Sequence, residues 1–210
     1  MPHSFRGRMA RLFAVTALVG LTACVQTTTQ TTMIDPRADR SAIGAGLDMR
    51  DFETAASDTV QSMLSSPALT KPGGGRYVLA VSRVTNDTMQ RIDTDLLVKK
   101  VRVDLLNSGK VVVTTAVGLA GPEDPMAMKT RQLRGSGEFN QSHVARKGQM
   151  IAPDLSLSGK IIQHDNRLGD GTQRIDYAFQ LSLTDINTGL AIWEGETPIS
   201  KLSSSRTVSW

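Results

Sequence analysis

Residues 76–115 read RYVLAVSRVTNDTMQRIDTDLLVKKVRVDLLNSGKVVVTT and predict one strand–helix–strand unit. The apolar run 77–81 does not alternate with polar residues, which is typical of a strand covered on both faces. A polar loop follows it. Asp93 and Asp95 then stand where carboxylates cap the first turn of a helix and favour the positive end of its dipole. The stretch therefore predicts a buried strand that leads through a loop into a capped helix.

The helix predicted after Asp93 has one apolar face and ends at a glycine. Residues 107–109, Asn-Ser-Gly, supply the glycine that can take the left-handed conformation after the last turn. The β-branched run 111–115 then predicts a second strand. Apolar residues of the helix recur at helical spacing, while the basic residues between them point elsewhere. The members of this stripe are Leu97, Val98, Val101 and Leu105.

Hydrophobic periodicity predicts further elements on both sides of this unit. Strict alternation over 175–184 indicates a half-buried strand with one face in water. Strands joined by turns, such as the one at 187–189, imply an antiparallel C-terminal half. The whole is therefore a mixed sheet packed by helices. The further helices are expected at 51–64, 122–133 and 142–149, and the further strands at 155–161, 175–184 and 190–193.

The N-terminus has the form of a secretory signal. Arg6, Arg8 and Arg11 precede an apolar core at 12–20, which is too short to span a bilayer. Residues 21–24, Leu-Thr-Ala-Cys, follow at once and resemble the lipobox of bacterial lipoproteins. In such proteins the signal peptidase cleaves before the cysteine, whose thiol carries a diacylglycerol and whose new amine is acylated.

Cys24 is the only cysteine of the chain and stands at the one position where lipidation requires it. The alternative is an ordinary cleavable signal with Ala23 at the cut and an incidental cysteine. Several acyl chains, at roughly 0.8 kcal/mol per buried methylene, would hold the protein on a membrane effectively permanently. Val25 follows the cysteine. By the common sorting pattern of lipoproteins, the absence of Asp there implies export to the outer membrane.

The sequence predicts four consecutive parts. Residues between Gln26 and Arg50 are rich in Thr and Gln and then in Asp, Arg and Gly, without apolar periodicity. Such a segment cannot bury enough surface to offset ordering entropy, so we expect a flexible tether. The parts are a lipoprotein signal peptide at 1–23, the lipidated cysteine and tether at 24–50, an α/β domain at 51–202 and a loose tail at 203–210.

Charge and composition argue against a nucleic-acid partner. The chain has 210 residues with a formal net charge of +4, 40% hydrophobic residues and only 4% aromatic residues. Arg6, Arg8 and Arg11 are lost with the signal, which leaves 21 Lys and Arg against 20 Asp and Glu. A nearly neutral mature chain with few aromatic side chains to stack bases offers no basic patch for nucleic acid.

No arrangement of residues predicts catalysis, a metal site or a cofactor. His143 and His164 each lack a second ligand at metal-binding spacing, so both are expected to be surface histidines. Residues 165–171 have oxygen ligands but not the spacing of a calcium loop, and a hairpin turn is expected instead. Residues 135–137, Gly-Ser-Gly, are too short for a nucleophile elbow and follow no strand. Asp93 with Asp95 is explained by helix capping. The sequence therefore predicts a membrane-anchored binding module that is not an enzyme.

Four segments together resemble one family. Residues 77–88 resemble the first strand and Asn-x-Thr loop of the LpoB family of penicillin-binding-protein activators. Residues 107–113 resemble its helix end and following strand, 154–162 its third strand, and 185–193 its final hairpin with a tryptophan. Each segment alone is a weak signal, but their order and spacing are fairly specific. The resemblance covers roughly 52–201 and adds to the lipobox.

The resemblance implies an α+β fold, a mixed and largely antiparallel four-stranded sheet packed by helices, like the N-terminal domain of TolB and related to the lipoprotein CsgG. It implies an outer-membrane lipoprotein on the periplasmic side. Such a protein would bind and activate a bifunctional penicillin-binding protein, the peptidoglycan synthase, and so regulate cell-wall synthesis. The alternative is a structural or export-complex subunit that uses the same fold for assembly.

Asn86 and Thr88 match the family loop, so the resemblance implies that they belong to the partner-binding face. Their alternative role is turn chemistry, because Asx and hydroxyl side chains bond to their own backbone in loops. Both roles stay open on the sequence.

Overall fold

The computed structural model of the chain describes residues 32–35, 38, 46–117, 124–169 and 171–204. The chain divides into two units, residues 1–35 and 36–210. In the first, the described residues 32–35 form neither helix nor strand. The predicted signal peptide, Cys24 and most of the predicted tether lie outside the described residues. Across the described ranges, no helix combines the length and hydropathy needed to cross a bilayer.

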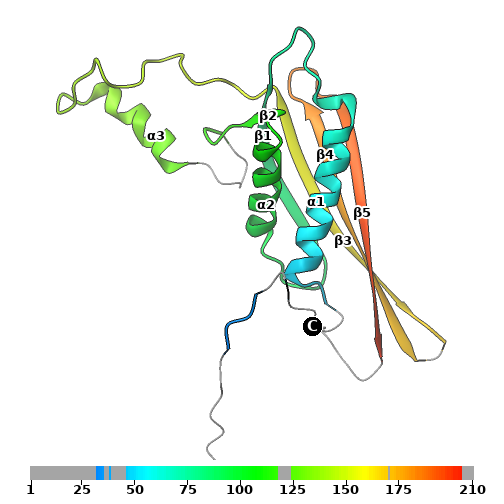
Figure 1. The fold of residues 1–210 in the computed structure, drawn as a ribbon. Helices are drawn as coiled ribbons and strands as arrows, with labels where there is room; N and C mark the ends of the chain where they lie inside the picture. Colours follow the sequence, from blue (N-terminus) through cyan, green and yellow to red (C-terminus); the bar gives the residue numbers. More distant parts are fainter. Residues whose placement is uncertain (1–31, 36–37, 39–45, 118–123, 170, 205–210) are drawn as a thin grey trace, which may run out of the picture. The chain divides into compact units, whose positions relative to one another are not determined.

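One mixed sheet forms the centre of the second unit (Figure 1). Its strands run in the order β2-β1-β3-β4-β5. The pairs β1/β2 and β1/β3 are parallel, and β3/β4 and β4/β5 are antiparallel. The strands are β1 (Tyr77–Asp87), β2 (Val111–Val113), β3 (Leu155–Arg167), β4 (Thr172–Asp185) and β5 (Ala191–Ser204).

The expected four-stranded, largely antiparallel sheet is wrong in both respects. The described residues form a five-stranded sheet in which half of the strand pairs are parallel. The difference comes from the two connections after β1. Helix α2 (Thr94–Asn107) returns the chain to run β2 parallel to β1 on the outer edge. The long segment 114–154 then brings β3 in parallel on the other side of β1.

Two helices, α1 (Met49–Ser65) and α2, cover one face of the sheet (Figure 1). The predicted apolar stripe of α2 is confirmed, because all four of its members are buried. The predicted half-buried strand at 175–184 is also confirmed within β4. Its inward residues, all buried, are Ile175, Tyr177, Phe179, Leu181 and Leu183.

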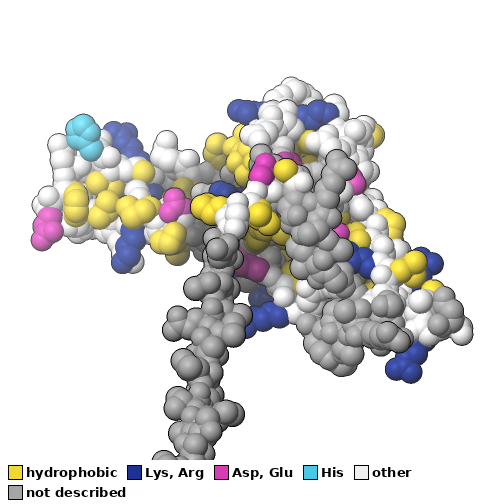
Figure 2. All heavy atoms as spheres, turned by 60° about the horizontal axis from the view of Figure 1, so that its bottom comes forward, with side chains coloured by type: hydrophobic (Ala, Val, Ile, Leu, Met, Phe, Trp, Pro, Cys, Tyr) yellow, Lys and Arg dark blue, Asp and Glu magenta, His cyan; other side chains and the backbone are white. Residues whose placement is uncertain are grey.

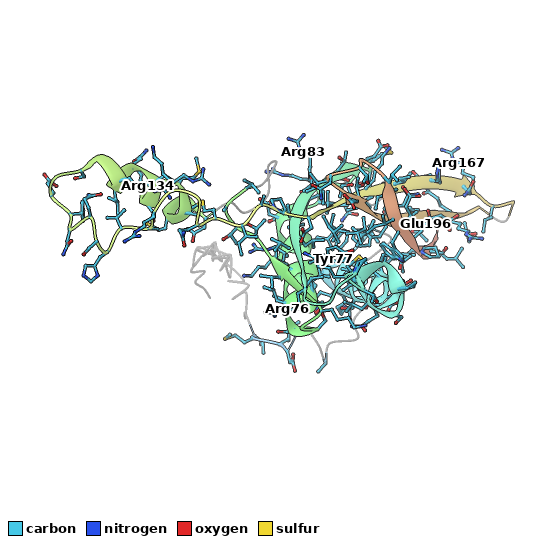
Figure 3. All side chains as sticks on the ribbon, turned by 90° about the horizontal axis from the view of Figure 1, so that it is seen from above. Arg76, Tyr77, Arg83, Arg134, Arg167 and Glu196 are labelled. Carbon is cyan, nitrogen blue, oxygen red and sulfur yellow. The ribbon has the colours of Figure 1, made fainter. Side chains whose placement is uncertain are left out.

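Strand β1 is covered on one face rather than on both. Leu79 and Val81 are buried beneath the helices, whereas Val78 and Ala80 on the opposite face are only half-buried. No helix among the described residues packs on that second face. Figure 3 shows Arg83, also exposed, pointing away from the helices. The short apolar run therefore predicted the strand but overstated its burial. The polar loop expected directly after it is wrong over most of its length, because β1 continues to Asp87 by pairing with β3.

Helix ends follow the capping residues. Asp48 caps α1 by accepting the N–H groups of Arg50 and Asp51, and the Asp51 side chain accepts the Asp48 N–H in return. Helix α1 therefore begins two residues before the predicted start at 51. Asp93 caps α2 as predicted, by accepting the N–H groups of Asp95 and Leu96.

In the connection between β2 and β3, the described residues form the helix α3 (Pro125–Gln132), which is followed by the short 3-10 helix η2 (Leu133–Gly135). Another 3-10 helix, η1 (Pro67–Leu69), follows α1. No residue of α3 is buried. The helix expected at 142–149 is wrong, since these residues form turns and irregular loop. They have no apolar face to bury against another element, so nothing stabilises a helix there.

The long strands at the C-terminal side extend beyond the predicted ends. β3 runs to Arg167 and β4 begins at Thr172, so the hairpin turn between them is shorter than the expected 165–171. β5 continues to Ser204, two residues past the predicted domain end at 202. Residues 205–210 of the predicted tail lie outside the described residues.

Candidate functional site

The loop after β1 is held by the two residues that the sequence predicted as partner-binding. The Asn86 side chain donates from Nδ2 to the Gln90 carbonyl at 2.8 Å and accepts the Thr88 hydroxyl at its Oδ1 at 2.7 Å. The Thr88 N–H also donates to this Oδ1 at 3.2 Å. These contacts are the turn chemistry that the sequence left open. Contact of Asn86 or Thr88 with a partner stays a prediction.

Gln90, which the sequence did not single out, joins this loop to the start of α1. The Leu47 N–H donates to Gln90 Oε1 at 2.8 Å, and Gln90 Nε2 donates to the Leu47 carbonyl at 2.8 Å. Leu47 is buried. A β-carbon on Gly46 would come within 3.0 Å of Gln90 Oε1, so this close approach favours a glycine. Asn86 and Thr88 therefore position Gln90, and Gln90 positions the residues that lead into α1.

Lys201 on β5 fixes the same segment from the other side. Its Nζ forms an ion pair with the Asp51 carboxylate, donates to the Gly46 carbonyl at 2.8 Å and lies 3.9 Å from Asp48 Oδ2. The side chain is only 18% exposed. No local sequence pattern could indicate these contacts, because they join residues about 150 positions apart through the register of β5.

The carboxyl group of Asp48 is ionised more readily than an ordinary aspartate. Burial by itself would raise its pKa. Hydrogen bonds from the Arg50 side chain and from the Asp51 and Arg50 N–H groups outweigh that, together with the charge of Lys201, and lower the pKa below 3.8. The start of α1 is therefore a charged and hydrogen-bonded junction.

A groove of about 580 Å³ lies beside this junction, between α1, α2 and the loop that joins β1 to α2. Its apolar lining includes Leu47 and Leu97, which are buried, and Phe52 and Ile92, which are partly buried and pack on the core. Gln90 also lines it. The two hydrogen bonds between the Gln90 side chain and the Leu47 backbone, which we call the Gln90 clamp, therefore hold two residues of the groove lining together. Figure 2 brings this end of the domain forward and shows hydrophobic side chains at the surface there.

Several apolar side chains that line the groove are exposed to solvent. Leu96 is 49% exposed and Val103 38% exposed on α2, and Met49 is 47% exposed on α1. Isolated exposed apolar residues are ordinary, but these three line one concave surface. Such a surface is suited to bind another apolar surface rather than to perform chemistry.

The remaining residues considered in the sequence do not come together. His143 and His164 are both exposed. No group of three or more His, Cys, Asp or Glu within the described ranges could hold a metal ion. Asp93 serves as the cap of α2. The lipid-attachment residue Cys24 lies outside the described residues, and its role stays a prediction.

Comparisons with known proteins identify the family. The sequence profile described as peptidoglycan-synthase activator LpoB matches residues 51–199, from the first turn of α1 to β5. A search of curated proteins finds no match.

Solved structures of that family are similar to the chain. The LpoB C-terminal domain from Salmonella enterica has 21% identity and a TM-score of 0.44, covering 71% of this chain and 98% of that one. The same domain from Escherichia coli has 19% identity and a TM-score of 0.45, covering 72% and 99%. The NMR structure of E. coli LpoB has 17% identity and a TM-score of 0.40, covering 96% and 88%.

Proposed function

Because the chain belongs to the LpoB family of peptidoglycan-synthase activators, we propose that it binds and activates a bifunctional penicillin-binding protein. The observation that carries this proposal is the family match over 51–199, which includes strands β1 to β4, most of β5, all of α2 and nearly all of α1. The protein acts by binding and is not itself an enzyme. Through the synthase it regulates cell-wall synthesis.

The synthase is reached from the outer membrane, to which the chain is anchored by lipid on Cys24. The only cysteine of the sequence follows Leu21-Thr22-Ala23 directly, after a short apolar segment with arginines before it. Membrane fractionation of cells that express Cys24→Ala tests this anchor. The wild type is expected in the outer membrane on its periplasmic face, and the variant is expected to be lost from it, because the acyl chains supply nearly all the membrane affinity. Equal sedimentation of the two proteins would contradict the anchor.

The synthase-facing surface is the end of the domain that contains the loop after β1. The groove between α1 and α2 opens at this end, and exposed apolar side chains line it. Asn86 and Thr88 support the loop through their bonds to each other and to the Gln90 carbonyl. They contribute to binding by holding this surface in shape as well as by any direct contact.

A glycan-polymerisation assay tests the activator function. The mature chain without lipid, residues 25–210, is added to a purified bifunctional penicillin-binding protein from the same organism, and glycan formation from lipid-linked precursor is followed. We expect a faster rate of glycan formation. In a separate surface-binding experiment, we expect the chain and the synthase to form a measurable complex. The control is the same chain denatured by heat. Absence of both stimulation and binding with every bifunctional synthase of the organism would contradict the proposal.

A further inference from the structure

We infer that the groove between α1 and α2 receives an amphipathic helix of the partner, with acidic residues toward α2 and a basic residue toward α1. This inference rests on the proposed function, because the partner is the synthase. It names the kind of segment that docks and the direction in which its charges face.

The α2 wall of the groove has a helical stripe that is not used by the core. Leu96, Lys99 and Val103 follow each other at spacings of three and four residues, so they share one face of α2. The buried stripe of the same helix lies on another face. Leu96 and Val103 are seven residues apart, which corresponds to about 10 Å along the axis, or two turns. The groove thus offers apolar contacts over a length that two or three turns of another helix would cover.

The side chains at the floor of the groove are held in place by core packing, whereas a side chain at its rim is flexible. Leu47 and Leu97 are buried in the core, and Phe52 packs against it. The two hydrogen bonds from the Gln90 side chain also restrain the backbone of Leu47. Met49, at the rim, has a flexible thioether side chain that can fill gaps against different partner surfaces. A preformed floor reduces the ordering cost of binding.

The charges around the groove are arranged by wall. Lys99 on α2 and Arg91 in the preceding loop line the groove, and neither forms a salt bridge with a described residue. Lys100 is already paired with Asp104 at 3.2 Å. Glu53 lines the α1 wall and likewise has no salt bridge within the described ranges. Asp93 also lines the groove, but its carboxylate accepts the Asp95 and Leu96 N–H groups at the start of α2. An occupant with acidic residues beside Lys99 and Arg91 and a basic residue beside Glu53 would complement the other three charges.

A helix fits this groove better than an extended strand. Strand addition needs a free row of backbone N–H and carbonyl groups at a sheet edge. The walls here are two helices and a loop. The first N–H groups of α2 are capped by Asp93, and the Gln90 carbonyl in the loop is bonded by Asn86 and Thr88. The recognition mode that remains is a partner helix that binds in the groove through its own side chains at helical spacing.

Substitutions on the α2 wall test the inference with the mature chain and the synthase that the wild type stimulates. Leu96→Glu places a charge in the apolar contact, and Lys99→Glu reverses the charge of the wall. Both side chains are exposed, so folding should be kept, and circular dichroism with urea unfolding checks this. The matched controls are Leu190→Glu, in the turn between β4 and β5, and Lys129→Glu on α3, both also exposed.

We expect each groove variant to weaken synthase binding by about tenfold or more and each control by less than about twofold. A photo-reactive residue at Val103 should crosslink to a synthase helix that has apolar residues at helical spacing beside acidic ones. Reversing one of those acids to Lys should restore binding to Lys99→Glu.

Three other results would overturn the inference in different ways. If the wild type binds the synthase and all four variants bind alike, the groove is not the site, and the proposed function stands. A crosslink to a strand or to a loop without acidic residues would show that the occupant is wrong. If the wild type binds no bifunctional synthase, the proposed function fails and the inference fails with it.

Discussion

The side chain of Gln90 pairs with the backbone of Leu47 as one strand residue pairs with another. It accepts the Leu47 N–H and donates to the Leu47 carbonyl, both at 2.8 Å. The two residues are 43 positions apart, one in the loop after β1 and the other just before α1. This single side chain therefore holds two distant segments at the end of the domain where the groove opens.

Replacing Gln90 by leucine should destabilise the domain. Gln90→Leu keeps much of the side-chain volume but leaves the N–H and carbonyl of the buried residue Leu47 without these partners. A part-buried backbone group that loses its partner costs about 1–3 kcal/mol. We therefore expect a loss of about 1–3 kcal/mol in the free energy of unfolding, measured in urea. Gln61→Leu, an exposed change on α1, should stay within about 0.5 kcal/mol. Equal effects would show that the clamp contributes nothing.

The Asp48 junction should make stability depend on acid pH. The pKa of Asp48 is lowered below 3.8 in the folded chain, so ionised Asp48 stabilises the fold above about that pH. This contribution is lost as the pH falls through the lower folded value. The difference in unfolding free energy between wild type and Asp48→Asn should therefore be constant near neutral pH and shrink in acid. Asp58→Asn, exposed on the same helix, is measured alongside as the control for removing one carboxylate from α1. A constant difference down to about pH 2 would contradict the assignment.

The two faces of β4 should respond differently to substitution. Leu181 is buried beneath the helices, whereas Gln180 lies on the opposite face and donates to Glu196 at 2.6 Å. Leu181→Ala should cost about 2–5 kcal/mol in urea unfolding, because it leaves a cavity in the core. Gln180→Ala should cost under about 0.5 kcal/mol, because it removes one exposed contact. Comparable losses would mean that the strand is covered on both faces.

The sequence predicted best the elements that local pattern determines. Alternation along 175–184 identified the buried face of β4, and the stripe from Leu97 to Leu105 identified the buried face of α2. Asp93 was predicted as a cap because capping depends on neighbouring residues only. The residue pattern indicated all five strands, whereas the resemblance implied four and a largely antiparallel sheet. The direction of pairing was predicted less well, because parallel pairing depends on the connections between strands rather than on the strands themselves.

The candidate site was predicted only in part. Asn86 and Thr88 were found because they match a loop motif, but their contacts with Gln90 depend on how the loop folds. Lys201 reaches Asp51 through the register of a strand that lies at the other end of the sequence. The groove is formed by α1 and α2 together, so neither helix indicates it alone.

Gly159 is another residue whose role becomes visible only in the sheet. It stands opposite Leu181 in the pairing of β3 with β4. A β-carbon built on it would lie 2.8 Å from Leu181 Cδ2, 2.9 Å from the Gln180 carbonyl oxygen and 3.2 Å from Val84 Cγ2. One of these neighbours is backbone, which cannot rotate away. The backbone torsion of Gly159 is ordinary for a strand, so the requirement for glycine is one of space.

Gly159→Ala should therefore destabilise the domain by about 1–3 kcal/mol, the usual cost of inserting a methyl group into a packed core. The matched control is Gly169→Ala, in the turn between β3 and β4, where a β-carbon would meet nothing within 4 Å. The control should change the free energy of unfolding by less than about 0.5 kcal/mol. Urea unfolding of both variants measures the difference. Adding Leu181→Val to Gly159→Ala makes room at the clash, so the double variant should be more stable than the sum of the two single losses predicts. Strict additivity would show that the new methyl group and Leu181 do not compete for the same space.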